Sequence, residues 1–163
     1  MAQINEKEAQ GHNTLAFLDM LAWSEGTDNG KQRTRNHGYD VIVGGELFSS
    51  YIDHPRKPVA LPKLGITSTA AGRYQLLSRY WDAYKDSLKL VGGFTPANQD
   101  RVAVQQIREQ GALKDIKAGR ITQAIAKCSN IWASLPGAGY GQREHTAEQL
   151  IVHYVIAGGM LDA

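Results

Sequence analysis

The 163-residue sequence lacks the features that mark disulfide-rich, membrane-spanning and secreted proteins. It contains a single cysteine, Cys128, so neither an intramolecular disulfide nor a four-thiolate metal site can form. No segment approaches the ~20 consecutive apolar residues that a membrane-spanning helix needs. Charged residues between Glu6 and Asp19 interrupt any apolar core of a signal peptide. We therefore expect synthesis in a cytoplasm, no membrane insertion, and a fold stabilised by packing.

Concentrated charge of one sign is also absent. Eighteen Lys and Arg residues against 16 Asp and Glu residues give a net charge of +2. The tightest basic group, Lys31, Arg33 and Arg35, lies in a polar stretch and is typical of solvated loop charges, with contacts to an anionic ligand as the alternative. The sequence thus argues against a dedicated nucleic-acid binder, while a polyanionic partner remains compatible with the mildly basic balance.

Short motifs of several large enzyme classes are missing as well. The sequence has no GxxxxGK[ST] nucleotide loop, no GxSxG nucleophile elbow and no HExxH zinc motif. Its histidines are widely separated, at positions 12, 37, 54, 145 and 153, which argues against a metal site. We expect that the protein needs neither a metal nor another cofactor.

Helical spacing of apolar residues dominates the pattern that is present. It predicts helices over residues 13–25, 73–89, 96–110, 112–118, 121–128 and 146–157. Thr95 followed by Pro96 is a typical helix start. The run Val41-Ile42-Val43 before two glycines predicts a β-hairpin over residues 39–48, and the prolines of residues 51–69 predict a long exposed loop. The chain is therefore predicted to be a single α+β domain over residues 1–163, mainly helical with a small β-hairpin or sheet.

One carboxylate stands out at the end of the first long helix. Glu25 follows the apolar run that ends in Trp23-Ser24, and a flexible segment begins at Gly26. Burial and the C-terminal helix dipole both raise a carboxyl pKa. Protonation near neutral pH needs a rise of roughly two units from ~4.3, or about 2.7 kcal/mol. The alternative is an ordinary surface glutamate near a helix end, and position alone leaves both interpretations open.

Three long segments of the sequence carry a resemblance to a known family. They are FLDMLAWSEGTDNGKQRTRNHGYDVIVGGELF, AGRYQLLSRYWDAY and CSNIWASLPGAGYGQ. Together they resemble the lambda-type endolysins of bacteriophages, in the same order from about residue 15 to residue 159. The resemblance implies a lysozyme-like fold with two lobes around a substrate cleft, and lytic transglycosylase activity. It leaves residues 1–12 unsupported, and we expect them to form a poorly ordered extension. It also departs at residues 60–69, where this sequence differs in composition and length.

The resemblance also implies roles for particular residues. The glutamate of the WSEGT segment is catalytic in that family, and the matching position here is Glu25. The AGRYQ segment resembles the glycine-glutamine motif of soluble transglycosylases, which predicts that Gln75 lines the cleft. Asp40 is predicted near the cleft, where it would tune Glu25 or bind sugar, with a purely structural role as the alternative. Asn130 and Tyr140 are the remaining candidates for substrate contact.

The implied substrate is the glycan strand of peptidoglycan, cut between N-acetylmuramic acid and N-acetylglucosamine with formation of 1,6-anhydromuramic acid ends. We expect a monomer that stays in the host cytoplasm until a holin-type membrane protein releases it to the periplasm and cell wall. One alternative is a true muramidase, a hydrolase of the same bond, with Asp40 or Glu46 as the second carboxylate. The other alternative is a glycan-binding module without catalysis.

Overall fold

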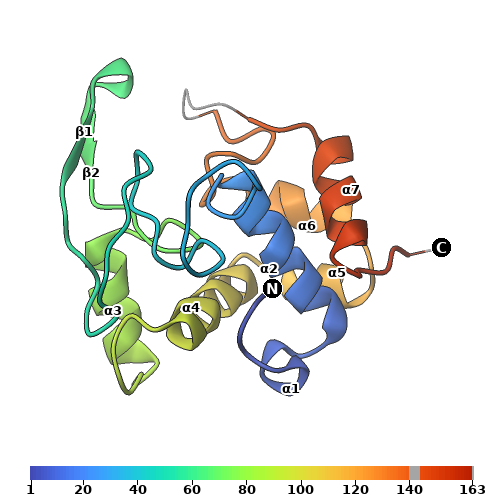
Figure 1. Ribbon diagram of the computed structural model, residues 1–163. Coiled ribbons are helices and arrows are strands. Elements are labelled where there is room, and N and C mark those ends of the chain that lie inside the picture. Colours follow the sequence, from blue (N-terminus) through green and yellow to red (C-terminus); the bar gives the residue numbers. More distant parts are fainter. Residues whose placement is uncertain (140–143, 163) are drawn as a thin grey trace.

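A computed structural model describes residues 1–139 and 144–162, which fold into a group of helices with a small antiparallel ribbon at one edge (Figure 1). The helices are α1 (Glu6–Ala9), α2 (His12–Ser24), α3 (Ser78–Ser87), α4 (Pro96–Glu109), α5 (Leu113–Lys117), α6 (Ile121–Cys128) and α7 (Ala147–Ile156). The strands β1 (Val59–Leu61) and β2 (Ile66–Ser68) are joined by the 3-10 turn η1 (Pro62–Leu64). The predicted mainly helical α+β class with a small sheet is confirmed.

The molecule has two lobes, each with its own hydrophobic cluster. The larger cluster surrounds α2, which is buried over most of its circumference, and includes residues of α4, α5, α6 and α7. The smaller cluster contains Trp81 of α3 with Phe94 and Val102. Because α4 contributes Val102 to the small cluster and Ile107 to the large one, this helix joins the two lobes. We call them the helical lobe (α1, α2 and α5–α7) and the ribbon lobe (residues 39–90).

The helix boundaries follow local capping chemistry. Thr95 caps α4 as predicted, because its side chain accepts a hydrogen bond from the Asn98 N–H and Pro96 occupies the first turn. The helix predicted over 73–89 begins only at Ser78. Residues before it form the isolated bridge between Ala71 and Leu76, and Gln75 adopts a left-handed φ of 55°. Gln75 therefore lies in a turn before the helix, and it lines the cleft described below.

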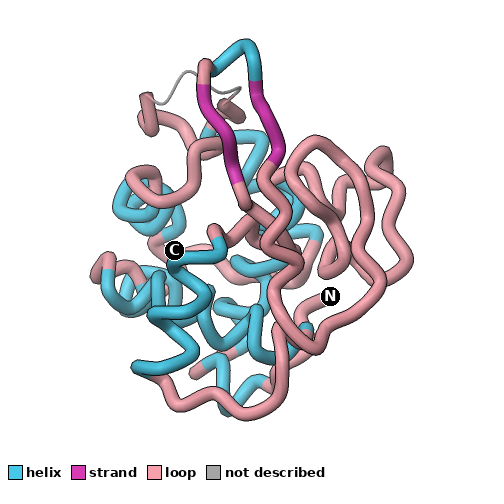
Figure 2. The backbone as a smooth tube through the Cα atoms, turned by 90° about the vertical axis from the view of Figure 1, so that its left-hand side faces the viewer, coloured by secondary structure: helices cyan, strands magenta, loops and turns pink. Residues whose placement is uncertain are grey.

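The regular sheet lies outside the predicted hairpin. Residues 39–48 contain only the isolated bridge between Val41 and Leu47, because the tight turn at Gly44-Gly45 leaves little room for a ladder and Ile42 bridges to Ala71 instead. The antiparallel strands β1 and β2, paired from Val59 with Ser68 to Leu61 with Ile66, form within the segment predicted as an exposed loop. Gly65, with a left-handed φ of 65°, closes the turn between them. Figure 2 shows this ribbon projecting from the rest of the chain.

The first twelve residues differ from the poorly ordered extension that the sequence predicts. Ala2 and Ile4 are buried, and α1 places Ala9 in the large hydrophobic cluster. The buried Asp100 accepts hydrogen bonds from the backbone N–H groups of Gln3 (2.6 Å) and Ile4 (3.0 Å). A buried carboxylate requires such donors, so the N-terminal segment is part of the packed structure.

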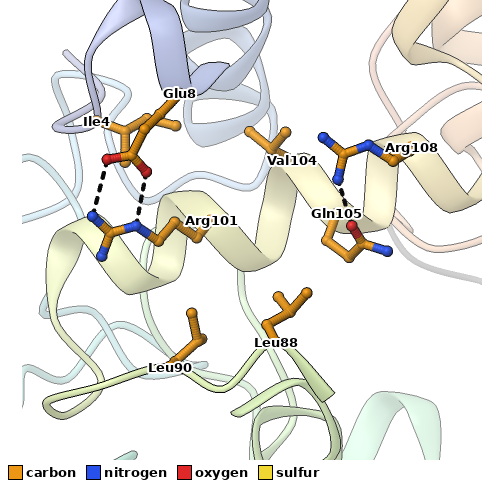
Figure 3. A pocket seen from close by; sticks show the side chains of 8 residues that line it. All are labelled: Ile4, Glu8, Leu88, Leu90, Arg101, Val104, Gln105 and Arg108. Carbon is orange, nitrogen blue, oxygen red and sulfur yellow. Dashed lines mark hydrogen bonds and ion pairs between the residues drawn. The ribbon is translucent and has the colours of Figure 1, made fainter. Parts of the chain in front are cut away.

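A groove between the N-terminal segment, α4 and residues 88–90 shows this packing from outside (Figure 3). Arg101 of α4 forms two hydrogen bonds with the carboxylate of Glu8, at 2.8 and 3.1 Å. Ile4 and Val104 line the same groove from above and Leu88 lines it from below. The groove therefore lies where α1 meets the helix that joins the two lobes.

Candidate active site

Glu25 lies directly after the buried helix α2. Its backbone N–H donates to Leu21 O at 2.8 Å and closes the last turn, so the side chain leaves the helix at its C-terminal end. The residue is partly buried and lines a cleft. Burial raises its pKa to about 7, against a smaller lowering effect of a hydrogen bond from Ser134. The carboxyl group is therefore half protonated near neutral pH, in the direction that the sequence predicts.

The cleft that Glu25 faces lies between the two lobes and encloses about 870 Å³. The helical lobe contributes Glu25, and residues Ile131 and Ala133 extend its wall. The opposite wall includes Val43 and Gly44, and residues 61–64, 66 and 68 of the ribbon and its turn. Among the described residues that line the cleft, Glu25 is the only carboxylate and Lys63 is the only cation. The site therefore offers one proton donor within an otherwise largely apolar groove.

Gln75 lines the same cleft as Glu25. Its side-chain amide nitrogen donates to Gly72 O at 2.9 Å and Val41 O at 3.2 Å. These two bonds fix the orientation of the amide and connect the turn to the segment that contains Val41. Gln75 is thus an oriented polar group in the wall of the cleft that Glu25 also lines.

The turn that presents Gln75 is anchored by its buried neighbour Arg73. The Arg73 guanidinium forms ion pairs with Asp19 at 2.8 Å and Asp28 at 3.2 Å. The backbone carbonyl of Arg73 accepts a hydrogen bond from Thr27 Oγ1 at 2.6 Å. Gly72 precedes it with a φ of 83°, and a Cβ at that position would lie 2.4 Å from Gln99 Oε1. The cleft wall therefore depends on a residue pair, Gly72-Arg73, that makes no contact with Glu25.

Asp40 lies outside the described lining of the cleft. It is 3% exposed, and its two carboxylate oxygens accept from Thr34 Oγ1 at 2.5 Å and from the Arg35 N–H at 3.0 Å. Both bonds close the loop of residues 34–40 on itself. The geometry favours the structural alternative for Asp40 over a role in tuning Glu25 or binding sugar.

The other predicted contact residues fall in different places. Asn130 lines an adjoining cavity of about 630 Å³ that shares Gln75 with the cleft, and its amide donates to Gln110 Oε1 at 2.7 Å. Tyr140 lies outside the described residues, so its contact with substrate stays a prediction. Glu46, a candidate second carboxylate, is exposed and forms an ion pair with Lys57 rather than lining the cleft.

Two serines next to Glu25 were not identified from the sequence. Ser134 Oγ donates to Glu25 Oε2 at 2.5 Å, and Ser24 Oγ lies 2.7 Å from Ser134 Oγ. Ser134 is 109 positions from Glu25, and no motif connects the two residues. Only Ser24, as the neighbour of Glu25 in the chain, could have been suspected from the sequence.

The described residues contain neither an obvious metal site nor a membrane helix. No three or more His, Cys, Asp or Glu side chains in this part of the chain gather as metal ligands would. In the same part, every helix is too short or too polar to cross a bilayer.

The chain is similar to known proteins in both sequence and structure. The family model for endolysins matches residues 15–161. The endolysin of Escherichia phage lambda is 70% identical over 145 residues, which span 88% of this chain and 90% of the relative. The endolysin of Escherichia phage P2 is 54% identical over 157 residues, or 91% and 94% of the two chains. Among solved structures, bacteriophage lambda lysozyme complexed with a chitohexasaccharide is similar with a TM-score of 0.87 and 62% identity over 99% of both chains. A second structure of lysozyme from bacteriophage lambda has a TM-score of 0.83 and 61% identity, also over 99% of both chains.

Proposed function

Because the chain belongs to the endolysin family, which cleaves the peptidoglycan of the bacterial host, we propose that it acts as a lytic transglycosylase with Glu25 as acid and base. The substrate is the bond between N-acetylmuramic acid and N-acetylglucosamine in the glycan strand. The observation that carries this proposal is the single carboxylate among the described residues of the cleft, held with a pKa of about 7.

The count of carboxylates bears on the reaction type. Most glycoside hydrolases use two carboxyl groups, one as the acid and one as the base or nucleophile. Here Asp40 is buried in its own loop and Glu46 pairs with Lys57 on the surface, so neither supports Glu25 in the cleft. A reaction in which the substrate supplies its own nucleophile needs only one carboxylate. That nucleophile is the C6 hydroxyl of muramic acid.

In the proposed reaction Glu25 first donates a proton and then accepts one, so it ends in its starting form. The protonated carboxyl donates its proton to the glycosidic oxygen as the bond from that oxygen to C1 of muramic acid breaks. The C6 oxygen then bonds to C1, and the C6 hydroxyl proton passes to the Glu25 carboxylate. The product is a 1,6-anhydro end, no water is consumed, and Glu25 is protonated again. A pKa of about 7 suits both halves of this cycle because neither form of the group is strongly favoured.

The similarity to a glycan-bound relative supports a sugar polymer as the ligand. Bacteriophage lambda lysozyme has been solved in complex with a chitohexasaccharide, and that structure matches this chain over 99% of its length. We infer that the cleft between the lobes binds the glycan strand, with Gln75 beside the reacting bond and Asn130 and Tyr140 further along. The cleft and the adjoining cavity share residues and form one extended groove for such a polymer.

We also infer the cellular setting from the family. The protein is made in the host cytoplasm as a monomer without a cofactor and needs a holin-type membrane protein for release to the periplasm and cell wall. It neither inserts into membranes nor binds nucleic acid.

Replacing Glu25 with Gln tests the catalytic assignment. The substitution keeps the size of the side chain but removes the transferable proton, so lysis of permeabilised cells should fall by at least about a hundredfold. The melting temperature and pelleting with purified peptidoglycan should be retained. Lysis at the wild-type rate by the folded variant would overturn the assignment of Glu25.

The end groups of the products separate the proposed reaction from its alternatives. Mass spectrometry of released muropeptides after borohydride reduction should show anhydromuramic acid ends that resist reduction. Reducible muramic acid ends, heavier by one water, would indicate the muramidase alternative. Binding of the wild-type protein to peptidoglycan without release of fragments would indicate the binding module.

A further inference from the structure

A short chain of hydroxyl groups leads from the interior of the helical lobe to the carboxylate of Glu25. Ser134 Oγ donates to Glu25 Oε2 at 2.5 Å, and Ser24 Oγ lies 2.7 Å from Ser134 Oγ. Both serines are buried, at 4% exposure for Ser24 and 7% for Ser134. A buried hydroxyl pair next to an ionisable group is unscreened by solvent, so its hydrogen bonds act strongly on that group.

The direction of this chain follows from the number of hydrogens available. Each serine hydroxyl has one hydrogen. Because that of Ser134 points at Glu25 Oε2, the hydrogen between the two serines belongs to Ser24. The order is therefore Ser24 donating to Ser134, and Ser134 donating to Glu25. This order holds for the ionised form of Glu25, in which Oε2 accepts from the Ser134 hydroxyl and the Ser134 backbone adds a second hydrogen bond to the carboxylate.

Other segments hold the serines in place. The backbone N–H of His145 donates to Ser134 O at 2.9 Å, and the ring nitrogen Nε2 of the same residue lies 3.1 Å from Ser24 O. A carbonyl oxygen only accepts, so this ring nitrogen is the protonated one. Trp23 packs against the His145 ring at 4.6 Å and against the His153 ring at 3.6 Å. Three separate parts of the chain thus meet at the serine pair: the end of α2, the turn around Ser134 and the segment before α7.

We propose that Ser134, supported by Ser24, is a positioning residue for the acid/base step, which holds the Glu25 carboxyl group through Oε2 and fixes its orientation toward the glycan. This inference rests on the proposed function of Glu25. The same hydrogen bond stabilises the carboxylate after the proton has left and so opposes the effect of burial. Without it Glu25 holds its proton more tightly and rotates more freely.

The charged and titratable groups near this arrangement are few among the described residues. Lys63 faces the cleft from the turn of the ribbon, and His145 contacts the Ser24 carbonyl. Glu144 is bound to the backbone N–H groups of Gly137 and Gly139, both at 3.0 Å. His153 lies behind Trp23. Serine substitutions leave all of these groups in place, so a change in the Glu25 titration reports on the hydroxyls.

The test combines a titration that is independent of activity with a rate measurement. The carboxyl carbon of Glu25 is followed by NMR in protein labelled with ¹³C-glutamate, and its signal is identified by its loss in E25Q. In Ser134→Ala the pKa of Glu25 should rise from about 7 by on the order of one pH unit, because the hydroxyl bond to the anion is gone while the backbone hydrogen bond of residue 134 is retained. Muropeptide release by this variant should fall about tenfold at fixed pH.

Matched variants separate positioning from a general effect on the structure. Ser134→Thr retains the hydroxyl and should restore both readouts, while Ser24→Ala should shift them in the same direction by less. Ser129→Ala is the control and should match the wild type, because Ser129 is a partly exposed serine whose Oγ donates to Ala126 O at 2.9 Å at the end of α6. A folded Ser134→Ala with wild-type titration and release would overturn the proposal. If Ser134→Ala unfolds, unchanged titration and release in Ser24→Ala would overturn it.

The catalytic role of Glu25 and the positioning role of Ser134 can be disproved separately. If E25Q still lyses cells, the proposed function fails, yet the titration of Glu25 in the serine variants still measures the effect of the hydroxyls. If E25Q is inactive but both serine variants behave like the wild type, only the positioning role of Ser134 fails.

Discussion

At the scale of single residues, folding favours the protonated form of Glu25, which is the minor form of an ordinary glutamate near neutral pH. Its environment raises the pKa to about 7 through burial, so the folded protein binds this proton more tightly than the unfolded chain does. For an acid with a raised pKa, the penalty on stability appears as pH rises above the unfolded value near ~4.3 and is complete above the folded value. A buried acid of this kind reduces the stability of the protein at neutral and alkaline pH.

E25Q is therefore predicted to be more stable than the wild type at alkaline pH and equally stable at acidic pH. Below about pH 4 both side chains are neutral, and the two free energies of unfolding should coincide. At pH 8 the variant should gain up to about 2 kcal/mol, a value discounted for the solvent that reaches the carboxyl group through the cleft. Urea unfolding at a series of pH values measures the difference. A constant difference across this range would contradict the raised pKa.

At the scale of elements, the ribbon of β1 and β2 is the part of the cleft that stability needs least. No residue of β1, η1 or β2 belongs to either hydrophobic cluster, and Ile66 is 50% exposed. Its residues nevertheless form one wall of the cleft that contains Glu25. Binding and folding are thus separable in this element.

Replacing residues 62–65 with the two-residue turn Asn-Gly is predicted to weaken glycan binding more than folding. The shortened ribbon loses cleft contacts from Lys63 and Leu64, so the protein fraction that sediments with purified peptidoglycan should fall several-fold. The melting temperature should change by no more than about 3 °C, because no core residue is altered. A large drop in melting temperature with unchanged binding would contradict this separation.

The elements also show how far the sequence alone reaches. Thr95 and Pro96 carry their own capping chemistry, so the start of α4 was predictable. The ribbon of β1 and β2 was not predictable in this way, because prolines and Gly65 are typical of a loop. The pairing of its strands is determined by the turn that Pro62 and Gly65 form. The role of Glu25 came from resemblance rather than from helix position, and the contact with Ser134 depends on tertiary packing across 109 positions. For Asp40 the sequence left a cleft role and a structural role open, and its hydrogen bonds within its own loop favour the structural role.

At the scale of the whole molecule, the family and the lysozyme-like two-lobed fold implied by the sequence are confirmed. The lobes share α4 and a buried polar network centred on Asp100. Its Oδ1 accepts from Tyr74 Oη at 2.6 Å and Tyr39 Oη at 2.8 Å, and Oδ2 accepts from the first residues of the chain. The N-terminal segment thus completes the joint between the lobes, next to the turn that presents Gln75.

Deleting residues 2–5 is predicted to destabilise the whole protein. The deletion removes the buried Ala2 and Ile4 and leaves Oδ2 of Asp100 without its two backbone donors. We expect a loss of about 3 kcal/mol in the free energy of unfolding, measured with urea. Gln3→Ala is the control and should be close to neutral, since Gln3 donates to Asp100 through its backbone. Wild-type stability of the truncated chain would show that the segment is dispensable.

The central claim is that one carboxylate cleaves the glycan without water, and digestion of peptidoglycan in H₂¹⁸O tests it most directly. Mass spectrometry of the released muropeptides should show anhydromuramic acid ends that contain no ¹⁸O, because the C6 oxygen of the substrate closes the ring. Muramic acid ends that carry one ¹⁸O atom at C1 would mean that water is the nucleophile, and the account of Glu25 as the single acid and base would be wrong.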